Sequence, residues 1–380
     1  MNGHSLLPPS SAARWVLCAG SVSLEAQYAS NVTIESAEAA AEGNAAHAIA
    51  AQLLRGEVWT VGTPAPNGIV TTDEMMEAAE MYTADVLAAM HTVPQPSGLY
   101  IEKLVKCAAV HEENWGTPDA WTWTPQDNGG VLRVWDFKYG HRFVDAFENW
   151  QLIDYTAGIL SREEFLGMDR RKIDVVLTVV QPRNFHPSGP VRRWELKANE
   201  LHIYFSQLEV AAVTAMAPNP ATRVSPECRD CKARHACEAL HFAADDAADR
   251  AGGSVALELP SDALGLELRT LHRAAALLNA RVTGLEEQAA ALLRSGKSVP
   301  FYRIGQSTAR EIWTKAPQEV FALGELMGVK LAKEPAPITP AQARKAGIPA
   351  DMLNGFVDRP PGALKLVPED TQQARKVFGK

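Results

Sequence analysis

An uninterrupted apolar run near the middle of the chain narrows the choice of folds most. Residues 172–182, KIDVVLTVVQP, are rich in β-branched side chains, as is typical of a strand that is buried on both faces. Two further strands are expected over 116–123 and 131–138, and the Asn and Gly residues of the 125–130 segment favour a hairpin between them. A sheet with buried strands needs helices to cover it, so the sequence predicts an α/β fold.

Helical and strand patterns alternate around this run. Further strands are expected over 98–106 and 191–196, and helices over 35–55, 72–90, 144–161 and 198–216. This order predicts an α/β (α+β) fold in which helices flank a mixed central sheet. A long helical pattern over 262–294 and a short one over 339–346 indicate a mostly helical C-terminal extension. The predicted domains are a core at 1–240, a helical segment at 241–300 and a small domain at 301–380.

Composition and charge leave most functions open. The chain is 46% hydrophobic and 22% charged, which is normal for a soluble globular protein. No apolar run approaches the roughly 18 residues of a membrane span, and the N-terminus lacks the pattern of a secretory signal. We therefore expect a cytoplasmic protein with no membrane partner. The net charge is −8, but residues 301–380 hold 12 Lys and Arg against 8 Asp and Glu. Nucleic-acid binding depends on local basic patches, so the total neither supports nor excludes it.

A charged pair interrupts the apolar strand at 131–138. Side chains alternate along a strand, so Asp136 and Lys138 point the same way. Asp119, on the neighbouring predicted strand, could converge with them. Two carboxylates and an ammonium at a sheet edge can hold Mg²⁺ or Mn²⁺ and a water beside a phosphate. An exposed ion pair on an edge strand would produce the same pattern, and a D-x-K match is by itself a weak signal.

Three of the five cysteines fall within ten residues. An odd number of cysteines in a chain without a secretory signal argues against a disulfide framework. The cluster Cys228-x₂-Cys231-x₅-Cys237 instead indicates a metal site. Thiolates bind both iron–sulfur clusters and zinc, and His235 could serve as a zinc ligand, so spacing alone does not separate the two. Cys107 is left over and is expected to be a buried or partly buried free thiol.

Four short motifs occur in an order that resembles the RecB-like branch of the PD-(D/E)XK nucleases. They are Gly43-x₃-His47, Gly116-x₂-Asp119, Asp136-x-Lys138 and Gln151-x₃-Tyr155. The resemblance covers roughly residues 10–240. It implies a restriction-endonuclease-like core and a metal-dependent deoxyribonuclease. Asp136 stands where the family more often has Glu, and both carboxylates serve in the family.

The resemblance implies a role for each matched residue. The ligands of Mg²⁺ or Mn²⁺ would be His47, Asp119, Asp136 and the backbone carbonyl of Phe137. The catalytic residues would be Lys138, Asp136, Asp119, Gln151 and Tyr155. Two acidic residues near these motifs are weaker candidates for supporting the ligands from behind, namely Glu42 and Glu102.

The cysteine layout is also similar to that of AddB and the CRISPR-adaptation nucleases of this branch. Those proteins place one cysteine before the nuclease core and three after it. The resemblance implies a structural [4Fe–4S] cluster held by Cys18, Cys228, Cys231 and Cys237. Zn²⁺ bound by the same thiolates, or with His235, is the alternative.

Three functional hypotheses follow. The chain as a whole resembles a family encoded by phages and prophages, which implies the bacterial host cytosol. The first hypothesis is a DNA nuclease, an exonuclease of phage DNA recombination, replication or processing that works on DNA with a recombination or replication protein. The second is a non-catalytic DNA-binding or scaffold protein that keeps the fold and its metal cluster. The third is a zinc-dependent interaction module.

Overall fold

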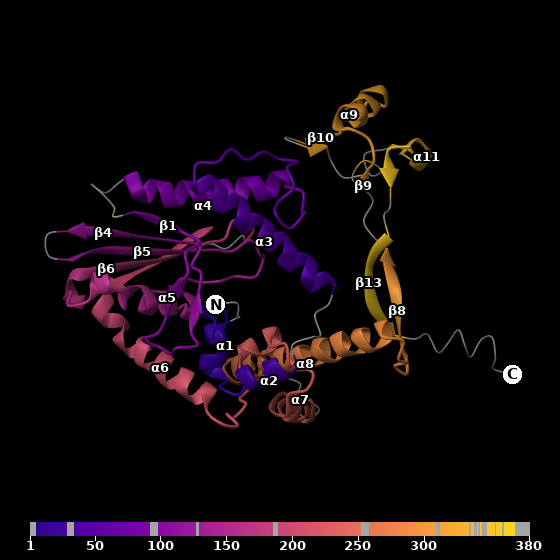
Figure 1. Ribbon diagram of the computed structural model, residues 1–380. Coiled ribbons are helices and arrows are strands. Elements are labelled where there is room, and N and C mark those ends of the chain that lie inside the picture. Colours follow the sequence, from indigo (N-terminus) through magenta and orange to yellow (C-terminus); the bar gives the residue numbers. More distant parts are fainter. Residues whose placement is uncertain are drawn as a thin grey trace. The chain divides into compact units, whose positions relative to one another are not determined.

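The protein divides into two compact units (Figure 1). One contains residues 1–32 and 36–287, and the other contains residues 33–35 and 288–380. No helix in the described part of the chain is both long enough and apolar enough to cross a membrane. The computed structural model describes residues 5–28, 34–91, 98–126, 129–184, 189–251, 258–308, 312–333 and shorter stretches between 336 and 368.

A five-stranded mixed sheet forms the centre of the first unit. β5 and β6 pair in parallel, and the other neighbouring strands pair antiparallel. The predicted α/β fold with a mixed central sheet is therefore confirmed, and β6 is the strand expected from the KIDVVLTVVQP run. The spatial order is β1 (Leu99–Ile101), β4 (Ala120–Gln126), β5 (Gly129–Phe137), β6 (Ile173–Val180) and β7 (Val191–Lys197).

Helices cover both faces of this sheet, as Figure 1 shows. α3 and α4 pack against Trp135 and Phe137 of β5 on one face. α1, α5 and α6 pack against Leu132 and Val134 of the same strand on the other. Alternate residues of β5 therefore serve two separate cores, which explains its nearly continuous burial. The helices are α1 (Ala12–Leu17), α3 (Ile34–Leu54), α4 (Asp73–His91), α5 (Trp150–Leu160) and α6 (His202–Met216).

The strand expected over 98–106 is instead two short strands in different sheets. β1 ends at Ile101, and β2 (Val105–Lys106) pairs with β3 (Trp115–Gly116). The break begins at Glu102, whose φ of 47° is a left-handed backbone conformation that non-glycine residues seldom adopt. The chain therefore turns directly beside the predicted metal ligands.

The helix expected over 144–161 begins six residues late, at Trp150. Asn149 caps it, because its side-chain oxygen accepts a hydrogen bond from the N–H of Gln151 at 3.0 Å. Residues 138–149 form irregular structure instead. This shift places Gln151 in the first turn of α5, directly beside the end of β5.

The region beyond residue 240 begins with two helices, in agreement with the predicted helical extension. α7 (Glu238–Ala251) is followed by α8 (Ser261–Arg294), which has no break. α8 packs on the cysteine-bearing segment. Arg234 forms a buried ion pair with Glu287, and Arg281 donates a hydrogen bond to the carbonyl of His235. α2 (Ser21–Tyr28) and η5 (Pro226–Asp230) complete the first unit near this segment.

Two glycines of α8 offer a matched test of this packing. We expect Gly284→Ala to lower the melting temperature, because its Cβ would lie 2.6 Å from Cγ of Arg234 and 2.9 Å from the backbone nitrogen of His235. We expect Gly265→Ala to raise it, because that Cβ meets no atom within 4 Å and alanine favours a helix by about 1 kcal/mol. Thermal unfolding of the three proteins measures both effects. If both substitutions shifted the melting temperature equally and in the same direction, the close packing of α8 at Gly284 would be contradicted.

The second unit combines short helices with two-stranded ladders around a core that includes Val320, Leu331 and Leu353. The helix expected over 339–346 falls largely outside the described residues. The helices are α9 (Pro317–Leu326) and α11 (Ala350–Leu353). The paired strands are β8 (Tyr302–Thr308) with β13 (Pro361–Pro368), β9 (Ile312–Trp313) with β12 (Val357–Asp358), and β10 (Ala332–Lys333) with β11 (Ala336–Pro337).

Candidate active site and cysteine pocket

A histidine and two carboxylates gather at one end of the sheet. His47 comes from α3, Glu102 directly follows β1 and Asp119 directly precedes β4. One potential ligand atom of each lies within 4.8 Å of the other two, and no other three His, Cys, Asp or Glu residues in the described chain come as close. Nδ1 of His47 is 3.0 Å from Oδ1 of Asp119. An imidazole with two carboxylates is a donor set that fits Mg²⁺ or Mn²⁺.

Asp136, Lys138 and Gln151 form a second group beside the first. Nζ of Lys138 lies 3.0 Å from Oδ2 of Asp136 and donates to Oε1 of Gln151 at 2.9 Å. Nε2 of Gln151 donates to the other carboxylate oxygen of Asp136, also at 2.9 Å. The Asp136 side chain is 2% exposed and that of Lys138 is 28% exposed. The Lys138 side chain is therefore partly exposed, whereas the Asp136 carboxylate is buried.

Phe137 links the two groups. Its backbone N–H donates to Oδ2 of Asp119 at 2.6 Å, which fixes the orientation of that carboxylate. Its ring packs against the His47 imidazole, with 5.3 Å between the ring centroids. The same ring stacks on the ring of Tyr82, with 4.9 Å between the ring centroids. The ligand roles predicted for Asp136 and for the carbonyl of Phe137 stay predictions, because the group of three potential ligands contains Glu102 and not Asp136.

Tyr155 supports the segment that carries Asp119. Its buried hydroxyl donates to the carbonyl of Thr117 at 3.0 Å. Gly116 is needed beside it, because a Cβ there would lie 2.9 Å from Pro9 and 3.1 Å from the Tyr155 ring and hydroxyl. Gln151 and Tyr155 lie one helical turn apart, and both reach toward the ends of β4 and β5.

The charges of the first group depend on one another. Burial raises the pKa of Glu102 to about 7, and the neighbouring charge of Asp119 adds to this rise. Burial acts to lower the pKa of His47, but the Asp119 carboxylate outweighs it and holds that pKa above its usual value. Burial would raise the pKa of Asp119, yet His47 and the Phe137 N–H hold it below its usual value. Burial raises the pKa of Asp136 despite the Lys138 ammonium. A bound divalent cation would favour the ionised forms of these carboxyl groups.

The two weaker acidic candidates, Glu42 and Glu102, lie in different surroundings in the structure. Glu42 is 48% exposed and forms an ion pair with Arg183 at 3.6 Å, and Arg183 also pairs with Glu74 at 2.9 Å. Glu42 therefore belongs to an ion-pair cluster around Arg183. Glu102 lies with His47 and Asp119, in a more direct position than the supporting role expected for it. Its sequence signal was only its place on a predicted strand before Asp119.

A second buried carboxyl, Asp154, lies under α5. Both of its oxygens accept hydrogen bonds from the side-chain nitrogen of Asn114 at 2.9 Å, and the thiol of Cys107 is also hydrogen-bonded to it. Cys107 is fully buried, in agreement with the free thiol expected from the sequence. Burial raises the pKa of Asp154 to about 7 from an ordinary value of 3.8.

This carboxyl predicts a specific pH dependence of stability. Because the folded state holds the Asp154 proton more tightly than the unfolded state, its contribution to the free energy of unfolding falls as pH rises from about 4 to 7. The loss amounts to roughly 4 kcal/mol by linkage. Asp154→Asn cannot ionise, so its melting temperature relative to wild type should rise steadily between pH 4 and pH 8. Parallel melting curves across that range would contradict the assignment.

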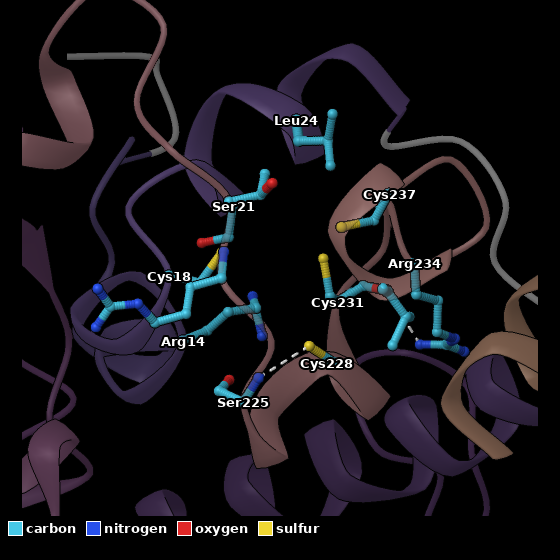
Figure 2. A pocket seen from close by; sticks show the side chains of 12 residues that line it. Arg14, Cys18, Ser21, Leu24, Ser225, Cys228, Cys231, Arg234 and Cys237 are labelled. Carbon is cyan, nitrogen blue, oxygen red and sulfur yellow. Dashed lines mark hydrogen bonds between the residues drawn. The ribbon is translucent and has the colours of Figure 1, made fainter. Parts of the chain in front are cut away.

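Four of the five cysteines line one pocket, which we call the cysteine pocket. It lies between α1, α2, η5 and α7. Figure 2 shows the side chains of Cys18, Cys228, Cys231 and Cys237 around this space, with Arg14 and Arg234 nearby. Segments about 210 residues apart in the sequence thus contribute to one site.

Backbone groups are directed at two of these sulfur atoms. The N–H of Arg223 donates to Sγ of Cys18 at 3.2 Å, and the N–H of Ser225 donates to Sγ of Cys228 at 3.3 Å. Such bonds stabilise thiolates and tune metal–sulfur sites. Burial nevertheless raises the pKa of Cys231 to about 12 and that of Cys18 and Cys228 above their usual value. A bound metal would therefore have to displace thiol protons.

His235, the alternative zinc ligand, does not line the cysteine pocket among the described residues. Its ring packs edge-on against Tyr28, with 5.5 Å between the ring centroids. The imidazole is thus buried beside Tyr28 and is not among the residues that line the pocket.

One family model matches the chain from residue 4 to residue 374, and its description is "Protein of unknown function (DUF2800)". The match spans the sheet with its candidate ligands, all four cysteines of the pocket and nearly all of the second unit. The candidate active site and the cysteine pocket therefore lie inside the matched range, and the chain belongs to the DUF2800 family.

Proposed function

We propose that the chain is a metal-dependent nuclease that hydrolyses phosphodiester bonds in DNA. One observation carries the proposal. His47, Glu102 and Asp119 place three metal-binding atoms within 4.8 Å of one another, and a lysine stands beside them at the end of β5. Three of the motifs that resemble the RecB-like nucleases supply His47, Asp119 and Lys138 in the family's order, which supports the choice of DNA as substrate. Glu102 lies outside these motifs.

In this proposal, each side chain of the candidate active site has its own chemical role. A Mg²⁺ or Mn²⁺ ion bound by His47, Glu102 and Asp119 would polarise a phosphoryl oxygen and acidify an attacking water. The Lys138 ammonium offsets negative charge that develops on the phosphate in the transition state. Asp136 and Gln151 hold this ammonium in place from below, since both contact its nitrogen.

Two further groups position the ligands. The Phe137 N–H holds the Asp119 carboxylate, and Tyr155 holds the backbone two residues before it. Neither reaches the reacting phosphate in this scheme, so both are positioning residues. Because fixed geometry supplies a large part of catalysis, loosening either contact should slow cleavage.

The test is a cleavage assay with end-labelled linear DNA and with covalently closed circular DNA of the same sequence. Mg²⁺ or Mn²⁺ should support cleavage and EDTA should stop it. Cleavage restricted to linear DNA would identify an exonuclease, and cleavage of both would identify an endonuclease. A protein that binds Mn²⁺ and DNA but cleaves neither substrate would instead support the rival, a non-catalytic DNA-binding or scaffold protein.

Glu102 offers a test of the metal site that does not depend on turnover. We expect Glu102→Gln to weaken Mn²⁺ binding by at least 10- to 100-fold, because losses of about that size follow even when only a group that supports a ligand is removed. Glu112→Gln is a matched control, since Glu112 is exposed and lies outside the group. Titration calorimetry of the three proteins measures the affinities. Equal affinity in the wild type and Glu102→Gln would remove Glu102 from the ligand set.

We further propose that the cysteine pocket holds a [4Fe–4S] cluster. A single zinc ion binds sulfur at about 2.3 Å, so tetrahedral ligands lie roughly 3.8 Å apart. Four thiolates could bind either metal, and the resemblance of the cysteine layout to that of AddB and the CRISPR-adaptation nucleases favours the cluster. The four-cysteine donor set and the N–H···S bonds fit an iron–sulfur cluster as well.

A further inference from the structure

A groove lies beside the cysteine pocket in the first unit. Its walls are the end of α1, residues 223–229 and one face of α8, and it opens onto about 1820 Å³ of space. Arg223, Ser225 and Cys228 line both the groove and the cysteine pocket. The groove therefore shares a wall with the cysteines and lies apart from the residues of the candidate active site.

The groove is basic in a part of the chain that is acidic overall. Residues 1–300 contain 25 Lys and Arg against 37 Asp and Glu, yet no acidic residue lines the groove. Its basic residues are all exposed, namely the three arginines Arg223, Arg229 and Arg273 together with His272. Arg223 and Arg273 form no ion pair with any residue that the structure describes, and Arg229 has Asp230 at 3.5 Å. The arginines are therefore available to an anionic ligand.

Between these charges the groove is lined by small and apolar side chains. Ala276, Ala280 and Thr283 follow one another at helical spacing on α8 and leave the groove wide. Val16 and Leu17 of α1 face the same space, and Leu17 is 41% exposed. A ligand that fits must therefore offer both negative charges and apolar faces.

The wall formed by α8 is held firmly. The side chains of the Arg234–Glu287 ion pair are only 10% and 11% exposed, and Arg281 donates to the carbonyl of His235. Gly284 allows close approach of α8 to the same segment. The width of the groove is thus set by the packing of α8 on the cysteine-bearing segment.

We propose that this groove binds a single-stranded segment of nucleic acid. Arg223, Arg229 and Arg273 contact its phosphates, and its bases lie on the apolar surface between them. A single strand exposes both phosphates and base faces, and proteins bind it with cationic grooves that contain stacking surfaces. A duplex hides its base faces and would leave the apolar surface unused. The choice of nucleic acid as the ligand rests on the proposed nuclease function.

The test measures binding in EDTA, where cleavage plays no part. The probes are a fluorescein-labelled oligo(dT) and a labelled duplex of the same length, followed by anisotropy. We expect wild type to favour oligo(dT), and Arg223→Glu/Arg273→Glu to weaken that binding at least tenfold with a shallower salt dependence. The double variant Lys106→Glu/Lys172→Glu makes the same change of net charge at exposed lysines outside the groove and should bind like wild type.

A second variant separates the groove from charge alone. Ala276→Trp changes no charge and fills the groove from an exposed helix position, so oligo(dT) binding should fall at least tenfold. The proposal would be overturned if the two charge variants lost binding equally, or if Ala276→Trp bound oligo(dT) as well as wild type does. It would also be overturned if the duplex bound more tightly than oligo(dT), or if poly-glutamate competed equally well. If the protein cleaves DNA but fails these tests, only the proposal for the groove is refuted. If it binds oligo(dT) through the groove but never cleaves DNA, only the proposed nuclease function is refuted.

Discussion

Lys138→Ala should lower the rate of metal-dependent DNA cleavage by about 10³-fold while Mn²⁺ affinity stays the same or increases. The lysine supplies the exposed positive charge next to the candidate metal ligands, and losing one such group commonly costs 10²- to 10³-fold in rate. Its removal also takes away a cation that repels metal ions. Cleavage rates with saturating Mg²⁺ and titration calorimetry with Mn²⁺ measure the two quantities separately.

Lys103→Ala is the matched control for this result. Lys103 is an exposed lysine directly after Glu102, and its ammonium lies over the Tyr100 ring, 4.8 Å from the centroid. If both alanine variants slow cleavage equally, the effect is general electrostatics rather than catalysis by Lys138. Thermal unfolding of Lys138→Ala is needed as well, since the variant leaves the buried Asp136 with only Gln151 as a partner. An unfolded variant would be replaced by Lys138→Gln, which keeps a hydrogen-bond donor.

The central sheet could be predicted because its signals are local. The β-branched run became β6, and the alternation around Asp136 and Lys138 correctly placed both side chains on one side of β5, where they contact each other. Motif spacing could also place Gln151 and Tyr155 on one face of a helix. In each of these cases, backbone periodicity alone fixes the direction of a side chain.

The features that the sequence did not reveal depend on contacts between distant segments. Glu102 reaches His47 and Asp119 because the chain turns there through a left-handed conformation, which no residue type at this position announces. The late start of α5 follows from a cap by Asn149 that competes with an apolar helical pattern extending upstream. The packing of α8 on Arg234 depends on Gly284, and one glycine in a long helix does not identify its partner.

Loss of the metal link at the cysteine pocket should cost the protein a large part of its stability. Cys18 and Cys228 are about 210 residues apart, and a cross-link that closes so long a loop restricts the unfolded chain by about 5 kcal/mol in the chain-entropy model. We therefore expect Cys18→Ala, purified without oxygen, to lose iron, sulfide and visible absorbance, and to unfold at much lower denaturant concentration than wild type.

Cys107→Ala is the control for metal content, because Cys107 is buried beside Asp154 and lies outside the pocket. It should keep the full iron and sulfide content, whatever small cavity it leaves in the core. A colourless wild-type protein that contains one zinc ion would contradict the iron–sulfur assignment, but it would still agree with a metal link between Cys18 and the later cysteines. A Cys18→Ala variant as stable as wild type would contradict the link itself. The pocket joins α1 and η5, which also form two walls of the basic groove, so loss of the link should weaken oligo(dT) binding along with stability.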